Sequence, residues 1–118
     1  MDKKIILASK SKVRKEILDK NNITSTVKPS NIDEDIIKTS LLSKKANPEI
    51  ISKNLAEVKA NKISIKYPDK LVLGADSVID LEGKLMSKPE NRENALEILK
   101  ELNGKSHYLI SSVCISKN

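Results

Sequence analysis

The chain has 118 residues, which is enough for one domain with a modest hydrophobic core and too few for two. Hydrophobic residues make up 38% of it and charged residues 32%, as in a soluble globular protein. Its net charge of +6 favours polyanionic partners, but it contains no Phe or Trp and no arginine-rich strip. A nucleic-acid-binding module relies on such residues, so that class is disfavoured.

Cysteine usage and hydropathy predict a protein of the cytoplasm. Cys114 is the only cysteine, which excludes an intramolecular disulfide and a cysteine zinc cluster. His107 has no His or Cys neighbour at ligand spacing, so we expect it to be a structural or surface residue. The apolar stretch near the N-terminus is too short for a signal peptide, and no later stretch is long enough to cross a membrane. We therefore expect no membrane partner.

The first predicted elements are a buried strand over residues 4–8 and a short helix that begins after Ser11, its natural N-cap. The apolar side of this helix is expected to consist of Val13, Ile17 and Leu18. A strand, then serines, then a helix N-terminus bearing Arg14 is an arrangement that can bind phosphate. Ordinary capping explains the same residues, and the glycines of a P-loop are absent.

A second strand is expected over residues 23–27, followed by an acidic loop at 29–35. Its three carboxylates belong to Asp33, Glu34 and Asp35. They fit two interpretations equally well: a metal site, or the acidic first turn of a following helix.

A long helix is predicted from its cap Asn47, with Pro48 in the first position, to about Lys66. We expect its buried stripe to be formed by Ile51, Leu55 and Val58. Lys59 is predicted to lie just off that stripe, where its amine can reach around the edge of the core.

The stretch 71–79 predicts a buried strand with one carboxylate, Asp76, in the middle of an apolar run. A carboxylate in such a place must be paired, hydrogen-bonded, metal-bound or used in chemistry. Gly74 allows a ligand or another backbone to approach closely. Glu82 and Gly83 predict a turn into a short strand over 84–86, which would deliver Lys88 beside Asp76.

The last predicted elements are a helix over 91–102, stopped by Gly104, and a strand over 107–115. The helix is expected to turn inward Ala95, Leu96, Leu99 and Leu102. The strand is apolar on both sides and should lie inside a sheet. Because the chain ends directly after it, we expect residues 1–118 to form a single domain that is truncated at its C-terminal end and, expressed alone, poorly soluble or inactive.

The order of elements indicates a mixed α/β architecture. Six segments carry a more specific signal: Leu7-Ala-Ser-Lys-Ser with Arg14, Ile32-Asp-Glu34, Leu55-Ala with Lys59-Ala60, Leu73-Gly-Ala-Asp76, Lys88-Pro89, and Leu102-Asn-Gly104 with His107. Each is weak alone, but their order resembles that of the Maf family of nucleoside triphosphate pyrophosphatases. The resemblance implies an α/β fold like that of Maf and inosine triphosphatase proteins, in which helices flank a mixed sheet and two lobes enclose a cleft. It also implies a homodimer.

The same resemblance implies hydrolysis of nucleoside triphosphates, including modified or non-standard ones, to the monophosphate and pyrophosphate with a divalent cation, Mg or Mn. It assigns Asp76 as the proton acceptor and places Glu34 with it at the metal and the attacking water. Phosphate contacts are assigned to Ser9, Arg14, Lys59 and Lys88. Substrate specificity is assigned to Val13, which stands where the family commonly has Arg, and to Ser77, which stands where it often has Thr or Gln.

The residues alone indicate a phosphate ligand, since positioning and electrostatics dominate phosphoryl chemistry. A non-catalytic nucleotide-binding regulator of cell division would use the same pocket. Such a sensor needs the lysines but no base, so the presence of Asp76 and Glu34 together with Lys59 and Lys88 favours the enzyme.

Overall fold

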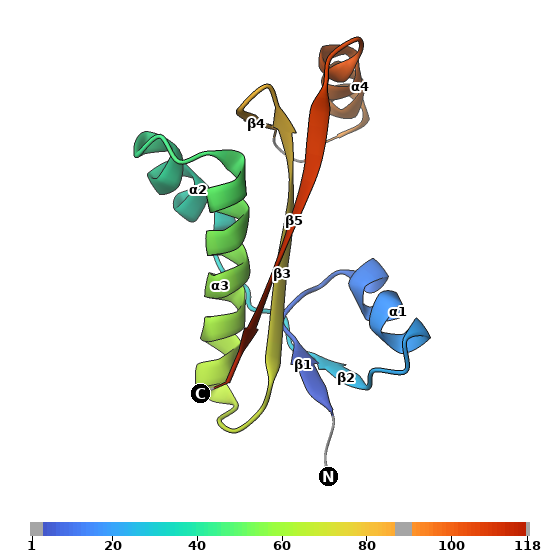
Figure 1. The fold of residues 1–118 in the computed structure, drawn as a ribbon, viewed down its shortest axis with the longest axis vertical. Helices are drawn as coiled ribbons and strands as arrows, with labels where there is room; N and C mark the ends of the chain where they lie inside the picture. Colours follow the sequence, from blue (N-terminus) through green and yellow to red (C-terminus); the bar gives the residue numbers. More distant parts are fainter. Residues whose placement is uncertain (1–3, 87–90, 118) are drawn as a thin grey trace.

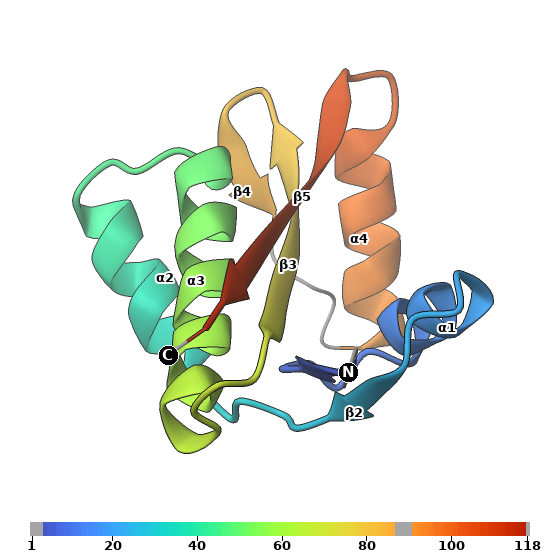
Figure 2. The same ribbon diagram turned by 60° about the horizontal axis from the view of Figure 1, so that its bottom comes forward.

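A computed structural model describes residues 4–86 and 91–117, which form five strands and four helices. In chain order these are β1 (Ile5–Leu7), α1 (Lys12–Lys20), β2 (Ser25–Val27), α2 (Glu34–Ser43), α3 (Pro48–Lys66), β3 (Val72–Leu81), β4 (Lys84–Met86), α4 (Arg92–Leu102) and β5 (His107–Ser116). The five strands make one mixed sheet. Helices α2 and α3 lie on one side of it, and α1 and α4 lie on the other (Figures 1 and 2). The mixed α/β class predicted from the sequence is confirmed.

Strand β3 is the centre of the sheet. Along one edge it pairs antiparallel with the whole of β5, from Val72 opposite Ser116 to Leu81 opposite His107. Its other edge is shared: β1 pairs parallel with its first two residues, and β4 pairs antiparallel with its last three. Residues 74–78 therefore have no strand partner on that second edge among the described strands. This gap in the sheet is where Asp76 lies.

Helix α3 covers one face of β3 and β5 (Figure 1). Its buried side chains include Ile51, Leu55 and Ile63, and the core continues through Ile6 and Val72 of the sheet. Asn47 caps the helix by accepting a hydrogen bond from the backbone N–H of Ile50, at 2.9 Å. The cap at Asn47 and the helix end at Lys66 were both predicted correctly.

The acidic segment is the start of a helix that the sequence did not predict as an element of its own. Asp33 is the N-cap of α2, with its carboxylate accepting a hydrogen bond from Ile36 N at 3.2 Å, and Glu34 and Asp35 fill the first turn. Negative side chains are favourable there because they face the positive end of the helix dipole. The helix interpretation of these carboxylates is therefore confirmed, although Glu34 also reaches the cavity described below.

Two amphipathic helices do not bury the sides that their sequences predicted. In α1, Val13 is 64% exposed and Ile17 53% exposed; in α4, Leu96 is 51% exposed and Leu99 62% exposed. The inward assignment of Leu96 and Leu99 is therefore wrong for the described structure, while Leu18 of α1 and Ala95 and Leu102 of α4 are half-buried. None of the described helices is both long and apolar enough to cross a membrane.

Strand β5 is also more exposed than predicted. Among the described strands it pairs only with β3, so its outer edge is free, and Leu109, Val113 and Ile115 are 71%, 65% and 68% exposed. The expected interior strand is therefore an edge strand here. Only its alternate residues pack on α3; they include the half-buried Cys114. Burial raises the pKa of the Cys114 thiol, and the Glu57 carboxylate raises it further, which disfavours the nucleophilic thiolate.

Helix α3 can approach β3 closely because residue 74 is glycine. A Cβ at this position would collide with the carbonyl oxygen of Ala56 and lie 2.7 Å from the backbone nitrogen of Ala60. The second of the two sequence readings of Gly74, close approach of another backbone, is the one the structure shows.

We predict that Gly74→Ala destabilises the fold by roughly 1–3 kcal/mol, because the added methyl group forces α3 and β3 apart. Urea unfolding followed by circular dichroism measures the change. The control is Gly104→Asn: nothing lies within 4 Å of a Cβ there, and Asn tolerates the left-handed φ of 72°. Equal losses in the two variants would contradict a specific role for the contact.

Candidate functional site

A cavity of about 370 Å³ opens beside the gap in the sheet. Its walls come from the loop after β1, the first turn of α1, the segment that leads into α2, and one side chain of α3. The lining residues are Ala8, Ser9, Lys10, Ser11, Arg14, Pro29, Ser30, Asn31, Ile32, Glu34 and Lys59. Four site residues predicted from the sequence, Ser9, Arg14, Glu34 and Lys59, therefore meet in one place.

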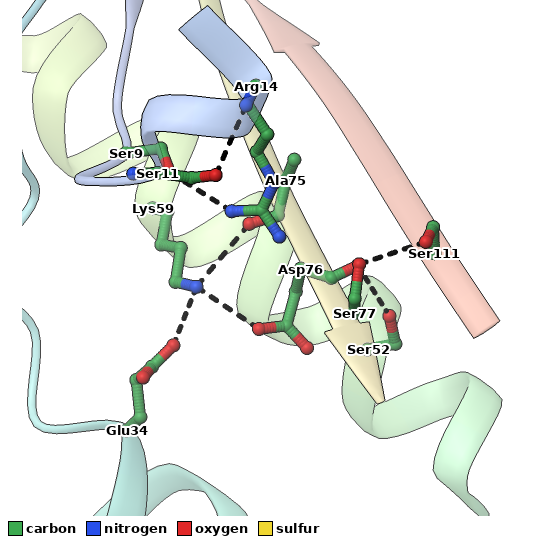
Figure 3. Close-up of polar contacts among 10 residues, drawn as sticks. All are labelled: Ser9, Ser11, Arg14, Glu34, Ser52, Lys59, Ala75, Asp76, Ser77 and Ser111. Atoms are coloured by element: carbon green, nitrogen blue, oxygen red, sulfur yellow. Dashed lines mark hydrogen bonds and ion pairs between the residues drawn. The ribbon is translucent and has the colours of Figure 1, made fainter. Parts of the chain in front are cut away.

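The α1 side of the cavity is held by two serines. The buried Ser9 hydroxyl accepts hydrogen bonds from Arg14 Nη1 at 3.0 Å and from the Ser11 backbone N–H at 3.1 Å (Figure 3). Ser11 caps the helix by accepting from Arg14 N at 3.2 Å, as predicted. A guanidinium and a helix N-terminus thus face the same space, which suits an anion.

Lys59 lies at the back of the cavity between two carboxylates (Figure 3). Its ammonium is 2.6 Å from Glu34 Oε1 and 3.1 Å from Asp76 Oδ1, and it donates to the Ala75 carbonyl oxygen at 3.4 Å. Only 11% of the Lys59 side chain is exposed. Lys59 is therefore on the buried stripe of α3, not beside it as predicted, while Val58 is only half-buried.

Asp76 lies behind Lys59 and does not itself line the cavity. Its side chain is 4% exposed, and its Oδ2 atom is buried without a hydrogen-bond partner among the described residues. Ser52, fully buried in α3, donates a hydrogen bond from its hydroxyl to the Asp76 carbonyl oxygen at 3.2 Å. Ser52 was missed from the sequence. Its position seven residues before Lys59, two turns earlier on the same helix face, is the signal that could have revealed it.

The two carboxylates fit a hard divalent cation that completes its shell elsewhere. Asp76 Oδ2 is a buried oxygen without a hydrogen-bond partner among the described residues, and Glu34 and Asp76 both lie against the Lys59 ammonium. Within residues 4–86 and 91–117, no three His, Cys, Asp or Glu side chains gather as a metal site. Mg²⁺ commonly binds through one or two carboxylates together with substrate phosphates and water, so this donor set suits it. A zinc site made entirely by the protein does not fit.

The remaining predicted site residues lie elsewhere. Ser77 points away from Asp76, as alternation along a strand requires, and its hydroxyl is 2.9 Å from the hydroxyl of Ser111 on β5 (Figure 3). Neither Ser77 nor the exposed Val13 lines the cavity. Lys88 lies outside the described residues. The roles assigned to these three residues stay predictions.

Taken together, the fold and the cavity define an α/β protein in which Arg14 and the N-terminus of α1 line a cavity beside a buried Lys–carboxylate cluster. The chain belongs to the family described as Maf-like protein, whose model matches residues 4–118. This finding confirms the resemblance seen in the sequence.

Curated relatives of this chain are named as pyrophosphatases. A Pelagibacter ubique (strain HTCC1062) protein named nucleoside triphosphate pyrophosphatase is 69% identical over 117 residues, covering 99% of this chain and 60% of the relative. A protein of the same name from Ruegeria sp. (strain TM1040) is 44% identical, covering 98% and 58%. The dTTP/UTP pyrophosphatase of Pyrococcus furiosus is 38% identical, covering 96% and 56%. The chain thus spans about 60% of the length of the relatives that it matches.

We predict that Lys59→Met costs roughly 3 kcal/mol or more of unfolding free energy, because it leaves the almost fully buried Asp76 carboxylate without its cation. Chemical unfolding measures this loss. The control is Lys53→Met in the same helix, where both partners of the Lys53–Glu49 pair are about 60% exposed. That variant should lose less than about 0.5 kcal/mol. A similar small loss for Lys59→Met would contradict its structural role.

Proposed function

We propose that the protein hydrolyses nucleoside triphosphates, including modified or non-standard ones, to the nucleoside monophosphate and pyrophosphate. The observation that carries this proposal is the cluster of Lys59 with Glu34 and Asp76. It lies at the back of a cavity that is lined by Arg14 and the N-terminus of α1. The names of the relatives support the same reaction. The cavity wall supplies positive charge for the substrate, and the cluster supplies carboxylates for the reaction.

In this proposal the phosphates lie against the α1 side of the cavity. Arg14 is held by Ser9 with its guanidinium at the cavity wall, so it can contact a phosphate oxygen without a large loss of side-chain freedom. Ser9 and Lys59 line the same space. Lys88 is assigned a further phosphate contact by the family resemblance. Phosphoryl chemistry depends mainly on such positioning and charge neutralisation.

Asp76 is proposed to accept the proton of the attacking water. Its Oδ1 atom is engaged by Lys59, which holds the carboxylate in one orientation, and its Oδ2 atom has no hydrogen-bond partner among the described residues. A base must reach the proton it removes at hydrogen-bond distance, and Oδ2 is the atom available for it. Glu34 and Asp76 would together hold the divalent cation, which when bound neutralises phosphate charge.

The alternative is a non-catalytic nucleotide-binding regulator of cell division. The cavity alone would serve an enzyme or a sensor, but a sensor has no use for the buried Asp76 Oδ2 atom, which no described residue engages in a hydrogen bond. Base preference is proposed to depend on Val13 and Ser77, and assays of a panel of triphosphates would test it. Such a panel should include dTTP and UTP, since one relative is named for them.

A homodimer in the cytoplasm is part of the proposal. The apolar side chains left exposed on β5 and α4 support an assembly, because apolar patches on this scale are commonly covered by other protein surface. Sedimentation analysis would show the oligomeric state. The single cysteine and the lack of a membrane-spanning helix among the described residues are consistent with the proposed location.

We predict that Asp76→Asn lowers the turnover number by about 10²–10⁴-fold while nucleotide affinity changes little, since the amide keeps the shape and removes the proton acceptor. Pyrophosphate release and nucleotide binding are measured in parallel. The control is Asp80→Asn on the same strand, whose carboxylate accepts a hydrogen bond from Gly83 N at 2.7 Å in the β3–β4 turn. Pyrophosphate release that survives in Asp76→Asn would contradict the assigned role.

We also predict that Lys88→Met and Lys59→Met weaken triphosphate binding more than monophosphate binding, because a triphosphate presents more negative charge. For Lys59, whose side chain is only 11% exposed, the difference should persist as salt is raised, because ions screen buried charges weakly. Titration calorimetry with both ligands at two salt concentrations measures it, with the exposed Lys44→Met as control. Equal losses for both ligands would mean that these lysines act on the fold alone.

A further inference from the structure

In this structure the Glu34 and Asp76 carboxylates face a cation that belongs to the protein itself, the Lys59 ammonium. Glu34 Oε1 and Asp76 Oδ1 both face the Lys59 ammonium, at 2.6 and 3.1 Å. The Ala75 carbonyl oxygen, at 3.4 Å, completes a set of three oxygens around one nitrogen. Figure 3 shows the ammonium placed between side chains that come from β3 and from the start of α2. Lys59 therefore stands where these same oxygens would hold a divalent cation.

Lys59 and a divalent cation would compete for these oxygens. Two positive centres a few ångströms apart repel strongly in a site that is mostly closed to water, where screening is weak. The two carboxylates carry two negative charges, of which Lys59 already neutralises one. A metal ion binding by itself would have to displace the ammonium and leave it buried without a partner, which is unfavourable.

A nucleoside triphosphate changes this balance. The cavity that would receive it is lined by Lys59 itself, so phosphate oxygens can approach the ammonium from the open side. Lysine has a flexible stem and a point charge that moves easily between partners. Phosphates would therefore give Lys59 a new partner at the moment when the carboxylates take the metal ion.

We propose that Lys59 is an internal counter-ion that keeps divalent cations out of the nucleotide-free site, and that the triphosphate releases the carboxylates by drawing Lys59 to its phosphates. This inference rests on the proposed function for the identity of the anion. It deepens that proposal by specifying that the metal ion enters with the nucleotide and not before it. By linkage, the metal ion must then raise nucleotide affinity by the same factor by which the nucleotide raises metal affinity.

The test measures Mn²⁺ binding to nucleotide-free protein by electron paramagnetic resonance. Wild-type protein should bind Mn²⁺ weakly, and Lys59→Met should bind it at least tenfold more tightly, because the ammonium no longer competes for the carboxylate oxygens. Mn²⁺ should also raise the melting temperature of Lys59→Met and leave that of the wild type unchanged. The matched control is Lys66→Met, which removes the same charge two turns further along α3 and should bind Mn²⁺ as the wild type does.

A second variant and a measurement on the wild type keep the test decisive if Lys59→Met misfolds. Lys59→Gln keeps a hydrogen-bond donor between the carboxylates and should show the same tighter Mn²⁺ binding if Lys59→Met does not fold. In the wild type, the α,β-methylene analogue of dTTP or of GTP should tighten Mn²⁺ binding at least tenfold beyond the affinity of the analogue alone for Mn²⁺. This arm needs no variant.

Two results would overturn the inference: tight Mn²⁺ binding by nucleotide-free wild type, or unchanged Mn²⁺ affinity in a folded Lys59 variant. Mn²⁺ affinity measured without nucleotide depends only on the Lys59–carboxylate cluster. Its outcome is therefore independent of whether the protein hydrolyses triphosphates. Absence of pyrophosphate release from every triphosphate would instead contradict the proposed function.

Discussion

The structure depends on the burial of the Asp76 carboxylate in the central strand, which is tolerable only because Lys59 reaches it from α3. An ion pair with one partner on a strand and the other on a helix requires the two elements to be close. That closeness comes from Gly74, where the backbone of α3 occupies the space of a side chain. Ser52 adds a hydrogen bond from the same helix to the same residue. The close packing at Gly74 and the Lys59–Asp76 ion pair therefore favour the same arrangement of α3 on β3.

The gap in the sheet gives this cluster its access to solvent. Strand β1 ends and β4 begins on the same edge of β3, and the unpaired stretch between them leaves room for side chains from α1, α2 and α3. The helix N-terminus of α1, with Arg14 held by Ser9, faces the cavity that results. A continuous sheet would have closed this site with backbone hydrogen bonds. An interrupted sheet combines a rigid platform with an opening to the cavity of about 370 Å³.

Apolar side chains on β5, α1 and α4 remain exposed. In the described structure these are alternate residues of β5, Val13 and Ile17 of α1, and Leu96 and Leu99 of α4. Covering apolar area of this kind lowers the free energy, and a free strand edge can pair with another chain. The chain spans about 60% of the length of the relatives that it matches.

Local signals in the sequence determined most of the elements, although not α2. Caps at Ser11 and Asn47 placed two helices, and the apolar run around Asp76 placed the central strand. The motifs also identified the family. Only the tertiary structure decided that Glu34 begins a helix and still reaches Lys59, since a short acidic segment favours helix capping and metal binding alike. It also decided which helix sides are buried and whether β5 has one neighbour or two. Periodicity shows that a side is apolar, but burial depends on which partner surface is present in space.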